Sequence, residues 1–244
     1  MSNEHIKALR GNDAHGESGE NTGCIFRCSR DGHNHRKNGF NYAKANLKSS
    51  YNIDFSKGVE KKRFDACFPN LFYRSKKRDP RVANSNVVYL GEGSYSHINW
   101  ATGFSPVRNQ AHHILPVNSI QSFLSKEQGG YLLQAKYNIN KGLNIIILPC
   151  DVEEAKAWEM LTHCGSHPTY NREVKVQIEN LKKLRNEANE REGHRPLRKQ
   201  DMSKLKKDLE EWSEDQMEEI LEEGKRNPGG KINACPTRPA TLAK

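Results

Sequence analysis

The stretch Gln110-Ala111-His112-His113-Ile114-Leu115-Pro116 places two histidines side by side on a segment that we expect to be extended. Successive side chains of a strand point to opposite faces, so the two imidazoles can serve different purposes. One can bind a metal ion while its neighbour accepts a proton from water. We therefore expect His112 to be a metal ligand and His113 to be a general base, the pairing that phosphodiester hydrolysis needs.

A second strand is predicted at residues 143–148, an apolar run that follows turn-forming residues 138–142 and that Pro149 ends. Paired with the histidine segment, it would make a two-stranded unit. Asn144 lies near its start, and an amide oxygen there can accept the second ring N–H of His113 and so orient the base. We assign Asn144 this catalytic role, and Lys141 is a candidate phosphate contact.

Two further histidines, His163 and His167, precede a helix that the spacing of Val174, Ile178 and Leu181 predicts from Pro168 to about residue 189. Gly165 and Pro168 disfavour regular helix between the histidines, so we expect a turn there. His167 is the preferred metal ligand, and His163 is either a second ligand or a phosphate contact.

Composition favours a polyanionic partner. The chain has 244 residues, a formal net charge of +9 and only 34% hydrophobic residues. Lysine and arginine side chains gain affinity for nucleic acids by releasing condensed counterions. No stretch approaches the ~20 apolar residues that span a bilayer, and the first residues do not form a classical signal peptide. We expect no membrane partner.

Shifts in composition suggest five regions. They are a flexible leader at 1–22, a basic subdomain of unknown fold at 23–100, the domain with the histidines at 101–190, a helical extension at 191–226 and a tail at 227–244. A short strand is predicted at residues 87–90 and a further helix after residue 200.

In the basic region, Cys24, Cys28, His33 and His35 can together ligate zinc, but their spacings match no standard finger or ribbon. The favoured interpretation is that these four residues are exposed polar side chains without a metal.

Three elements of the sequence together resemble a known family. They are Ala111-His112-His113, the run from Leu143-Asn144 to Leu148-Pro149, and the element from His163 to Asn171 with the pattern His-x-Gly-Ser-His-Pro-x-Tyr. They resemble the AHH family of the HNH/endonuclease VII superfamily, over about residues 105–185. The resemblance implies an α+β fold with a ββα-metal core, in which a hairpin carries the histidine pair and a helix contributes the last ligand.

The resemblance also implies the roles given above, with one divalent ion, Mg²⁺, Zn²⁺, Mn²⁺ or Ni²⁺, at His112, His163 and His167. Tyr170 belongs to the same element and is either a nucleic-acid contact or a surface or capping residue. Members of this family are commonly bacterial toxins that secretion machines deliver into rival cells and that a cognate immunity protein neutralises. We therefore expect a metal-dependent DNase. It would be made in the bacterial cytoplasm and delivered without a signal peptide to the cytoplasm of a target cell. A secretion apparatus or chaperone is expected as a further partner.

Other functions fit the same residues. The proposed metal centre does not distinguish the sugar or the bases of the substrate. The protein can therefore also be an RNase or a sequence-selective phage or mobile-element HNH endonuclease. From a different class, the histidines can form a structural zinc site in a non-catalytic nucleic-acid-binding module. The last helices, with Trp212 on their apolar face, can also serve as a docking surface.

Overall fold

The computed structural model describes residues 22–67, 87–89, 109–191 and 199–243, apart from residues 29, 31, 55 and 164. The predicted leader lies outside them, except for its last residue. In the first half of the chain the elements are α1 (His35–Asn46), α2 (Lys48–Tyr51), β1 (Asn52–Asp54), α3 (Gly58–Cys67) and β2 (Val87–Tyr89). The second half contains β3 (Asn109–His113), α4 (Val117–Phe123), α5 (Lys126–Gln134), η4 (Gly142–Asn144), β4 (Ile145–Pro149), α6 (Val152–Trp158), α7 (Pro168–Arg191), η5 (Lys199–Asp201), α8 (Met202–Arg226) and η6 (Ile232–Ala234).

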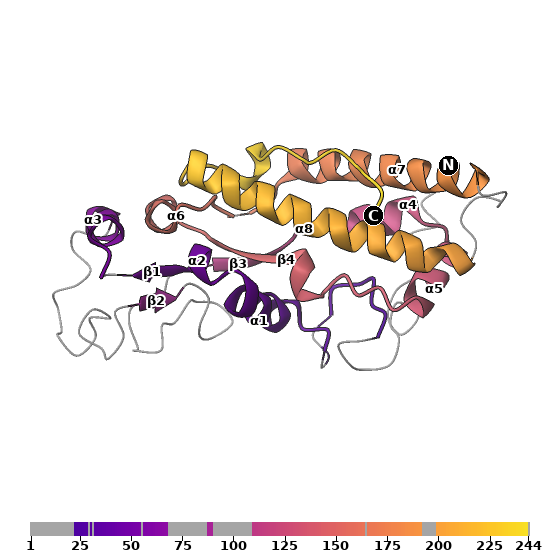
Figure 1. Cartoon of the computed structure of the whole chain (residues 1–244), viewed down its shortest axis with the longest axis horizontal. Helices are drawn as coiled ribbons and strands as arrows, with labels where there is room; N and C mark the ends of the chain where they lie inside the picture. The colour runs from indigo at the N-terminus through magenta and orange to yellow at the C-terminus, as the bar shows by residue number, and fades with distance from the viewer. Residues whose placement is uncertain are drawn as a thin grey trace.

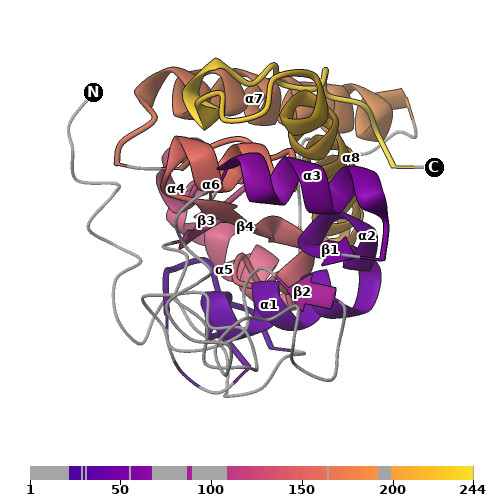
Figure 2. The same ribbon diagram turned by 90° about the vertical axis from the view of Figure 1, so that its left-hand side faces the viewer.

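The centre of the fold is the antiparallel pair β3–β4, in which His113 lies opposite Ile145 and His112 opposite Ile146. Every residue of β4 is buried. Figures 1 and 2 show why: α7 and α8 cover one side of this pair and α1 lies on the other. The predicted α+β class is confirmed. The strand starts two residues later than predicted, because Leu143 and Asn144 form the last part of the 3-10 turn η4.

The link between the two strands is longer than a hairpin turn. It spans residues 114–144 and contains α4 and α5, which the sequence did not predict. Ser125 starts α5 with a capping box, since its hydroxyl accepts the N–H of Gln128 and the Gln128 side chain accepts the N–H of Ser125.

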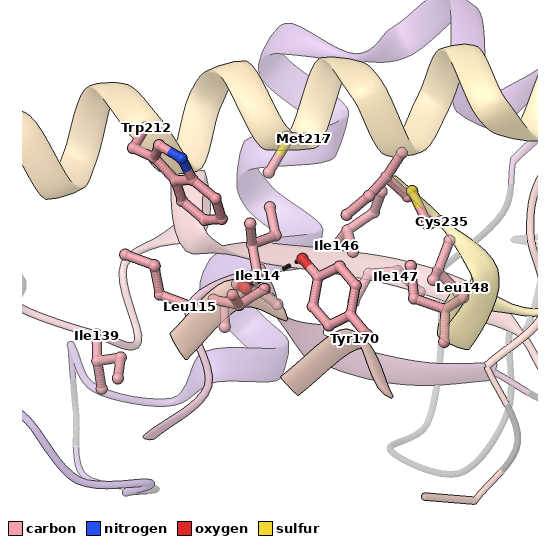
Figure 3. Packing of buried hydrophobic residues seen from close by; sticks show 14 of the residues in the cluster. Ile114, Leu115, Ile139, Ile146, Ile147, Leu148, Tyr170, Trp212, Met217 and Cys235 are labelled. Carbon is pink, nitrogen blue, oxygen red and sulfur yellow. Dashed lines mark hydrogen bonds between the residues drawn. The ribbon is translucent and has the colours of Figure 1, made fainter. Parts of the chain in front are cut away.

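The two long helices α7 and α8 lie side by side (Figure 1), and their buried apolar side chains belong to the same core cluster as those of β4. Their buried faces repeat at helical spacing, as predicted. Figure 3 shows Trp212 and Met217 of α8 packed above Ile146 and its neighbours. A buried ion pair joins the helices, with Arg185 donating to both carboxylate oxygens of Asp208 at 2.6 and 2.5 Å. Helix α8 is continuous from Met202 to Arg226, and Ser213 is buried inside it.

The described part of the N-terminal region packs onto the same core. Ile25, Ile53 and Phe64 belong to one buried cluster with the strands. Helix α1 approaches β4 closely at Gly39, where a Cβ atom would lie 2.4 Å from Cγ2 of Ile145. The predicted strand at 87–90 is confirmed as β2, which pairs with β1. The predicted region boundaries stay predictions. Among the described residues, no helix has the length and apolar character needed to cross a bilayer.

The C-terminal segment, predicted to be a tail, is packed against the helices. Ile232 and Cys235 are buried, and Trp212 donates its indole N–H to the carbonyl of Arg238 at 3.1 Å. Asn233 caps the start of α7, because its Oδ1 accepts the backbone N–H groups of Thr169 and Tyr170 at 2.9 and 3.2 Å. A segment far away in sequence therefore fixes the beginning of the helix that follows His167.

Replacing Asn233 by alanine is expected to lower the free energy of unfolding by about 1 kcal/mol, the usual cost of losing a helix cap. Urea unfolding followed by circular dichroism measures this change. Asn233→Ser keeps a hydroxyl acceptor at the cap and should recover part of the loss. Equal stability of Asn233→Ala and the wild type would show that the C-terminal segment does not support α7.

Candidate metal centre

The two adjacent histidines point to different parts of the molecule, as predicted. His112 is 2% exposed and its ring meets Tyr170 of α7, with 5.1 Å between ring centroids. His113 meets the opposite layer, where its ring stacks on His35 of α1 at a centroid distance of 5.1 Å. The alternation of the β3 strand explains this separation.

Three histidines come together on the α7 side of the strands. The ring nitrogens that His112, His163 and His167 can offer to an ion all lie within 4.8 Å of one another. His163 is held next to the strands because its backbone N–H donates to the carbonyl of Pro149 at 2.8 Å. His167 directly precedes α7. The turn predicted between the two later histidines thus brings both of them to His112.

The chemistry of this cluster fits a metal ion. Nε2 of His112 and both ring nitrogens of His163 are buried and have no hydrogen-bond partner among the described residues. Each buried polar atom without a partner costs about 1–3 kcal/mol, and coordination to an ion satisfies one ring nitrogen of each histidine. Nδ1 of His167 lies 2.8 Å from Oδ1 of Asn171, a contact that directs Nε2 towards the cluster.

Burial keeps two of these imidazoles neutral. Together with a smaller effect of the neighbouring His167, it lowers the pKa of His163 to about 4. The pKa of His112 falls well below its ordinary value for the same main reason, with additional effects from His163 and His167. Since a metal ligand must be the neutral imidazole, His112 and His163 can bind an ion at neutral pH without first losing protons.

His113 stands beside this cluster and is oriented by Asn140. Its Nε2 lies 3.1 Å from Oδ1 of Asn140. The amide group of Asn140 donates to the carbonyl of Phe26 at 2.8 Å, so its oxygen faces the imidazole as an acceptor. Nε2 therefore carries the proton and Nδ1 has the lone pair. Burial lowers the pKa of His113 to about 4, while the bond to Asn140 opposes part of this shift.

Asn144 and His113 are both described by the structure, and the predicted hydrogen bond between them is not formed. Its Oδ1 accepts the backbone N–H of Leu115 at 2.7 Å, and its Nδ2 donates to the carbonyls of Ile139 and Leu115 at 2.8 and 3.3 Å. These bonds tie the two ends of the link between β3 and β4 to each other. Asn144 supports the site through the backbone, four residues away from the asparagine that contacts the base.

We expect Asn144→Ala to lower the free energy of unfolding by at least about 1–3 kcal/mol, because the buried N–H of Leu115 loses its acceptor. Denaturant unfolding measures the change, and Asn180→Ala, on an exposed position of α7, is the matched control. A variant with unchanged stability and no cleavage would instead support the catalytic role that the sequence predicted for Asn144.

A cavity of about 560 Å³ joins the three-histidine cluster to His113. Its lining also includes Arg27 and Arg36. Arg27 is exposed, and Arg36 is half-buried beside Asn109, 3.4 Å from its Oδ1. The sequence did not predict a role for either arginine, nor the contact of His35 with His113, because only the fold brings residues 27–36 to the strands. Their one visible signal is the basic character of that region.

The two predicted nucleic-acid contacts lie elsewhere. Lys141 pairs with Glu210 of α8 at 3.1 Å, outside the lining of the cavity. Tyr170 is fully buried, and its hydroxyl donates to the carbonyl of Ile114 at 3.1 Å (Figure 3). In this structure Tyr170 holds α7 against the strands beneath His112, where a nucleic acid does not reach it.

Comparison with known proteins identifies the part of the chain that contains the site. Residues 94–209 match the model of AHH, a nuclease family of the HNH/ENDO VII superfamily with a conserved AHH. In this chain the three letters are Ala111, His112 and His113. Searches of curated proteins and of solved structures found no significant match. The matched segment contains β3, β4, α7 and every histidine of the cavity, so the part of the chain that holds the site is similar to the AHH nucleases.

Proposed function

We propose that this protein is a metal-dependent endonuclease that hydrolyses DNA phosphodiester bonds with one divalent ion. The observation that carries the proposal is the division of the His112-His113 pair. His112 joins two other imidazoles in a cluster suited to an ion, while His113 faces the same cavity with a separate partner. The nuclease family supports the reaction class.

Each side chain has a defined task in the proposed reaction. A divalent ion held by His112, His163 and His167 would supply positive charge to the phosphoryl group and the leaving oxygen. His113 accepts a proton from the attacking water through Nδ1, and Asn140 holds the imidazole in that tautomer. Three imidazole donors suit Zn²⁺ or Ni²⁺ better than Mg²⁺, which prefers oxygen ligands.

The direct test is cleavage of a supercoiled plasmid and of a structured RNA by the purified protein. Zn²⁺, Ni²⁺, Mn²⁺ and Mg²⁺ are each added after treatment with a chelator. The proposal expects conversion of the plasmid to nicked and linear forms with at least one of these ions and no cleavage in the chelator alone. Intact plasmid with all four ions would contradict it, and cleavage of RNA alone would make the enzyme an RNase.

The arginines of the cavity are expected to bind the substrate phosphates. Removing Arg27 takes away one phosphate contact, so Arg27→Ala should reduce the slope of log affinity against log salt by about 1. Fluorescence anisotropy with a labelled duplex measures the slope in the absence of metal. Lys141→Ala removes the same charge away from the cavity and should leave the slope unchanged. An unchanged slope in Arg27→Ala would place the DNA on another face.

We further propose that the nuclease acts as an antibacterial toxin with a cognate immunity protein. The family supports this role, since AHH nucleases are commonly toxin domains. The proposal includes delivery by a secretion apparatus or chaperone into the cytoplasm of the target cell. Expression of the wild type in a bacterial cytoplasm should stop growth and degrade the chromosome, whereas His113→Ala should be tolerated. Normal growth with active wild-type enzyme present would contradict the toxin role.

A further inference from the structure

A second group of potential metal ligands lies outside the matched nuclease segment. Cys24, Cys28 and His33 are all buried, at 0%, 9% and 0% exposed, and their ligand atoms lie within 4.8 Å of one another. This burial contradicts the interpretation of these residues as exposed polar side chains. None of the three belongs to the cavity of the three-histidine cluster.

The backbone fixes the two cysteines where they meet. Cys24 exchanges hydrogen bonds with the segment before η4, since its N–H donates to Tyr137 and its carbonyl accepts from Ile139, both at 2.7 Å. Cys28 forms an isolated bridge with Asn34, immediately before α1. The cluster therefore connects the N-terminal segment, the first turn of α1 and the chain that leads into β4.

Both sulfur atoms receive N–H donors, which is the environment that stabilises a metal-bound thiolate. The backbone N–H of Arg30 donates to Sγ of Cys28 at 3.3 Å, and the amide of Asn140 donates to Sγ of Cys24 at the same distance. In the thiol form, Sγ of Cys24 donates its proton to the carbonyl of Phe26 at 3.1 Å. An ion would take the place of that proton.

The imidazole of the cluster also has an orienting contact. Oγ1 of Thr22 lies 2.8 Å from Nε2 of His33. A contact at one ring nitrogen directs the other towards an ion, as at many zinc sites. His35, the fourth residue of the sequence pattern, stacks on His113 and is not part of the cluster.

We infer that Cys24, Cys28 and His33 form a second, structural metal site for Zn²⁺ or a similar thiophilic divalent ion, bound through two sulfurs and Nδ1. Two thiolates and an imidazole are a typical donor set for zinc, and water completes the tetrahedral coordination. Binding replaces the two thiol protons, which pass to solvent, so the ion is taken up without any change of oxidation state.

The site is connected to the catalytic histidine by a single side chain. The amide of Asn140 donates to Sγ of Cys24, while its Oδ1 contacts Nε2 of His113. A metal-bound thiolate carries negative charge and therefore accepts the amide N–H of Asn140 more strongly than the neutral thiol does. The structural ion would thus support the orientation of His113 without contacting the substrate.

Cobalt binding provides a test that does not depend on the nuclease centre. Thiolate bound to Co²⁺ gives an intense charge-transfer band in the near ultraviolet, and the three-histidine cluster contains no sulfur. Titration of the reduced, metal-free protein with Co²⁺ should produce this band. It should persist in His167→Ala and in Cys67→Ser, whose cysteine lies outside the cluster, and it should lose intensity in Cys28→Ser, which keeps only the thiolate of Cys24.

X-ray absorption of the zinc-loaded wild type gives a second measurement that needs no variant. It should detect sulfur in the first coordination shell, together with nitrogen from both sites. Absence of the cobalt band and of zinc–sulfur scattering in the reduced wild type would overturn the structural site. A band of undiminished intensity in Cys28→Ser would do the same. Failure of the catalytic centre to bind metal would leave the band in place, so the two proposals fail separately.

Discussion

His113→Ala should lower the rate of phosphodiester cleavage by about 10²–10⁴-fold, the usual contribution of a general base, while the protein stays folded and keeps its metal. The reason is the position of His113, which shares the cavity with the metal cluster but is oriented by Asn140. Plasmid nicking under single-turnover conditions measures the rate. Metal content and the far-ultraviolet circular dichroism spectrum are recorded on the same sample.

Two controls make this result specific. Asn140→Asp keeps an oxygen acceptor for Nε2 and should retain more activity than Asn140→Ala, which leaves the imidazole without that contact. His35→Phe keeps a ring stacked on His113 and should remain active. If His113→Ala lost its metal or failed to fold, the residue would be a ligand or a structural group, and the non-catalytic zinc module would become the better interpretation.

His167→Ala is expected to weaken metal binding at the catalytic centre by more than about 100-fold and to abolish cleavage at limiting metal. Changes in residues that only orient a ligand already cost about 10–100-fold in affinity, and His167 is one of three proposed ligands. Competition with a chromophoric chelator measures the affinity. The half-exposed position of His167 makes a folded variant attainable, in contrast to the buried His112.

Asn171→Ala supplies the matched comparison, since it removes only the contact that orients His167. Its loss of affinity should fall in the range of about 10–100-fold, between the wild type and His167→Ala. Excess zinc should restore cleavage in Asn171→Ala more readily than in His167→Ala. Unchanged affinity and full activity in His167→Ala would remove this residue from the metal centre.

The elements that the sequence predicted correctly are those with a strong local pattern. Helices α7 and α8 have apolar stripes at helical spacing, and these stripes predicted both helices. Helices α4 and α5 were missed because they are short, and adjacent glycines in α5 weaken its helical signal. The packed C-terminal segment has no helical or strand periodicity in its sequence. Individual side chains hold it in place, such as Asn233 through its hydrogen bonds to the start of α7.

The part of the site that could be predicted is the set of histidines, because several closely spaced histidines are an unusual pattern. Adjacent histidines and a later pair of histidines indicate an ion, and the structure brings three of them together. The choice between Asn140 and Asn144 depends on which amide faces His113, and the sequence places both at the start of the second strand. Likewise, the burial of Cys24 could not be predicted, because it depends on contacts with residues more than a hundred positions away.

The most direct test of the account is the position of the metal in zinc-loaded crystals, found from anomalous scattering at the zinc edge. We expect an ion bound to ring nitrogens of His112, His163 and His167, with His113 in the same cavity but not coordinated. An ion bound by His113 itself, or no ion between these three histidines, would contradict the proposed division between ligand and base.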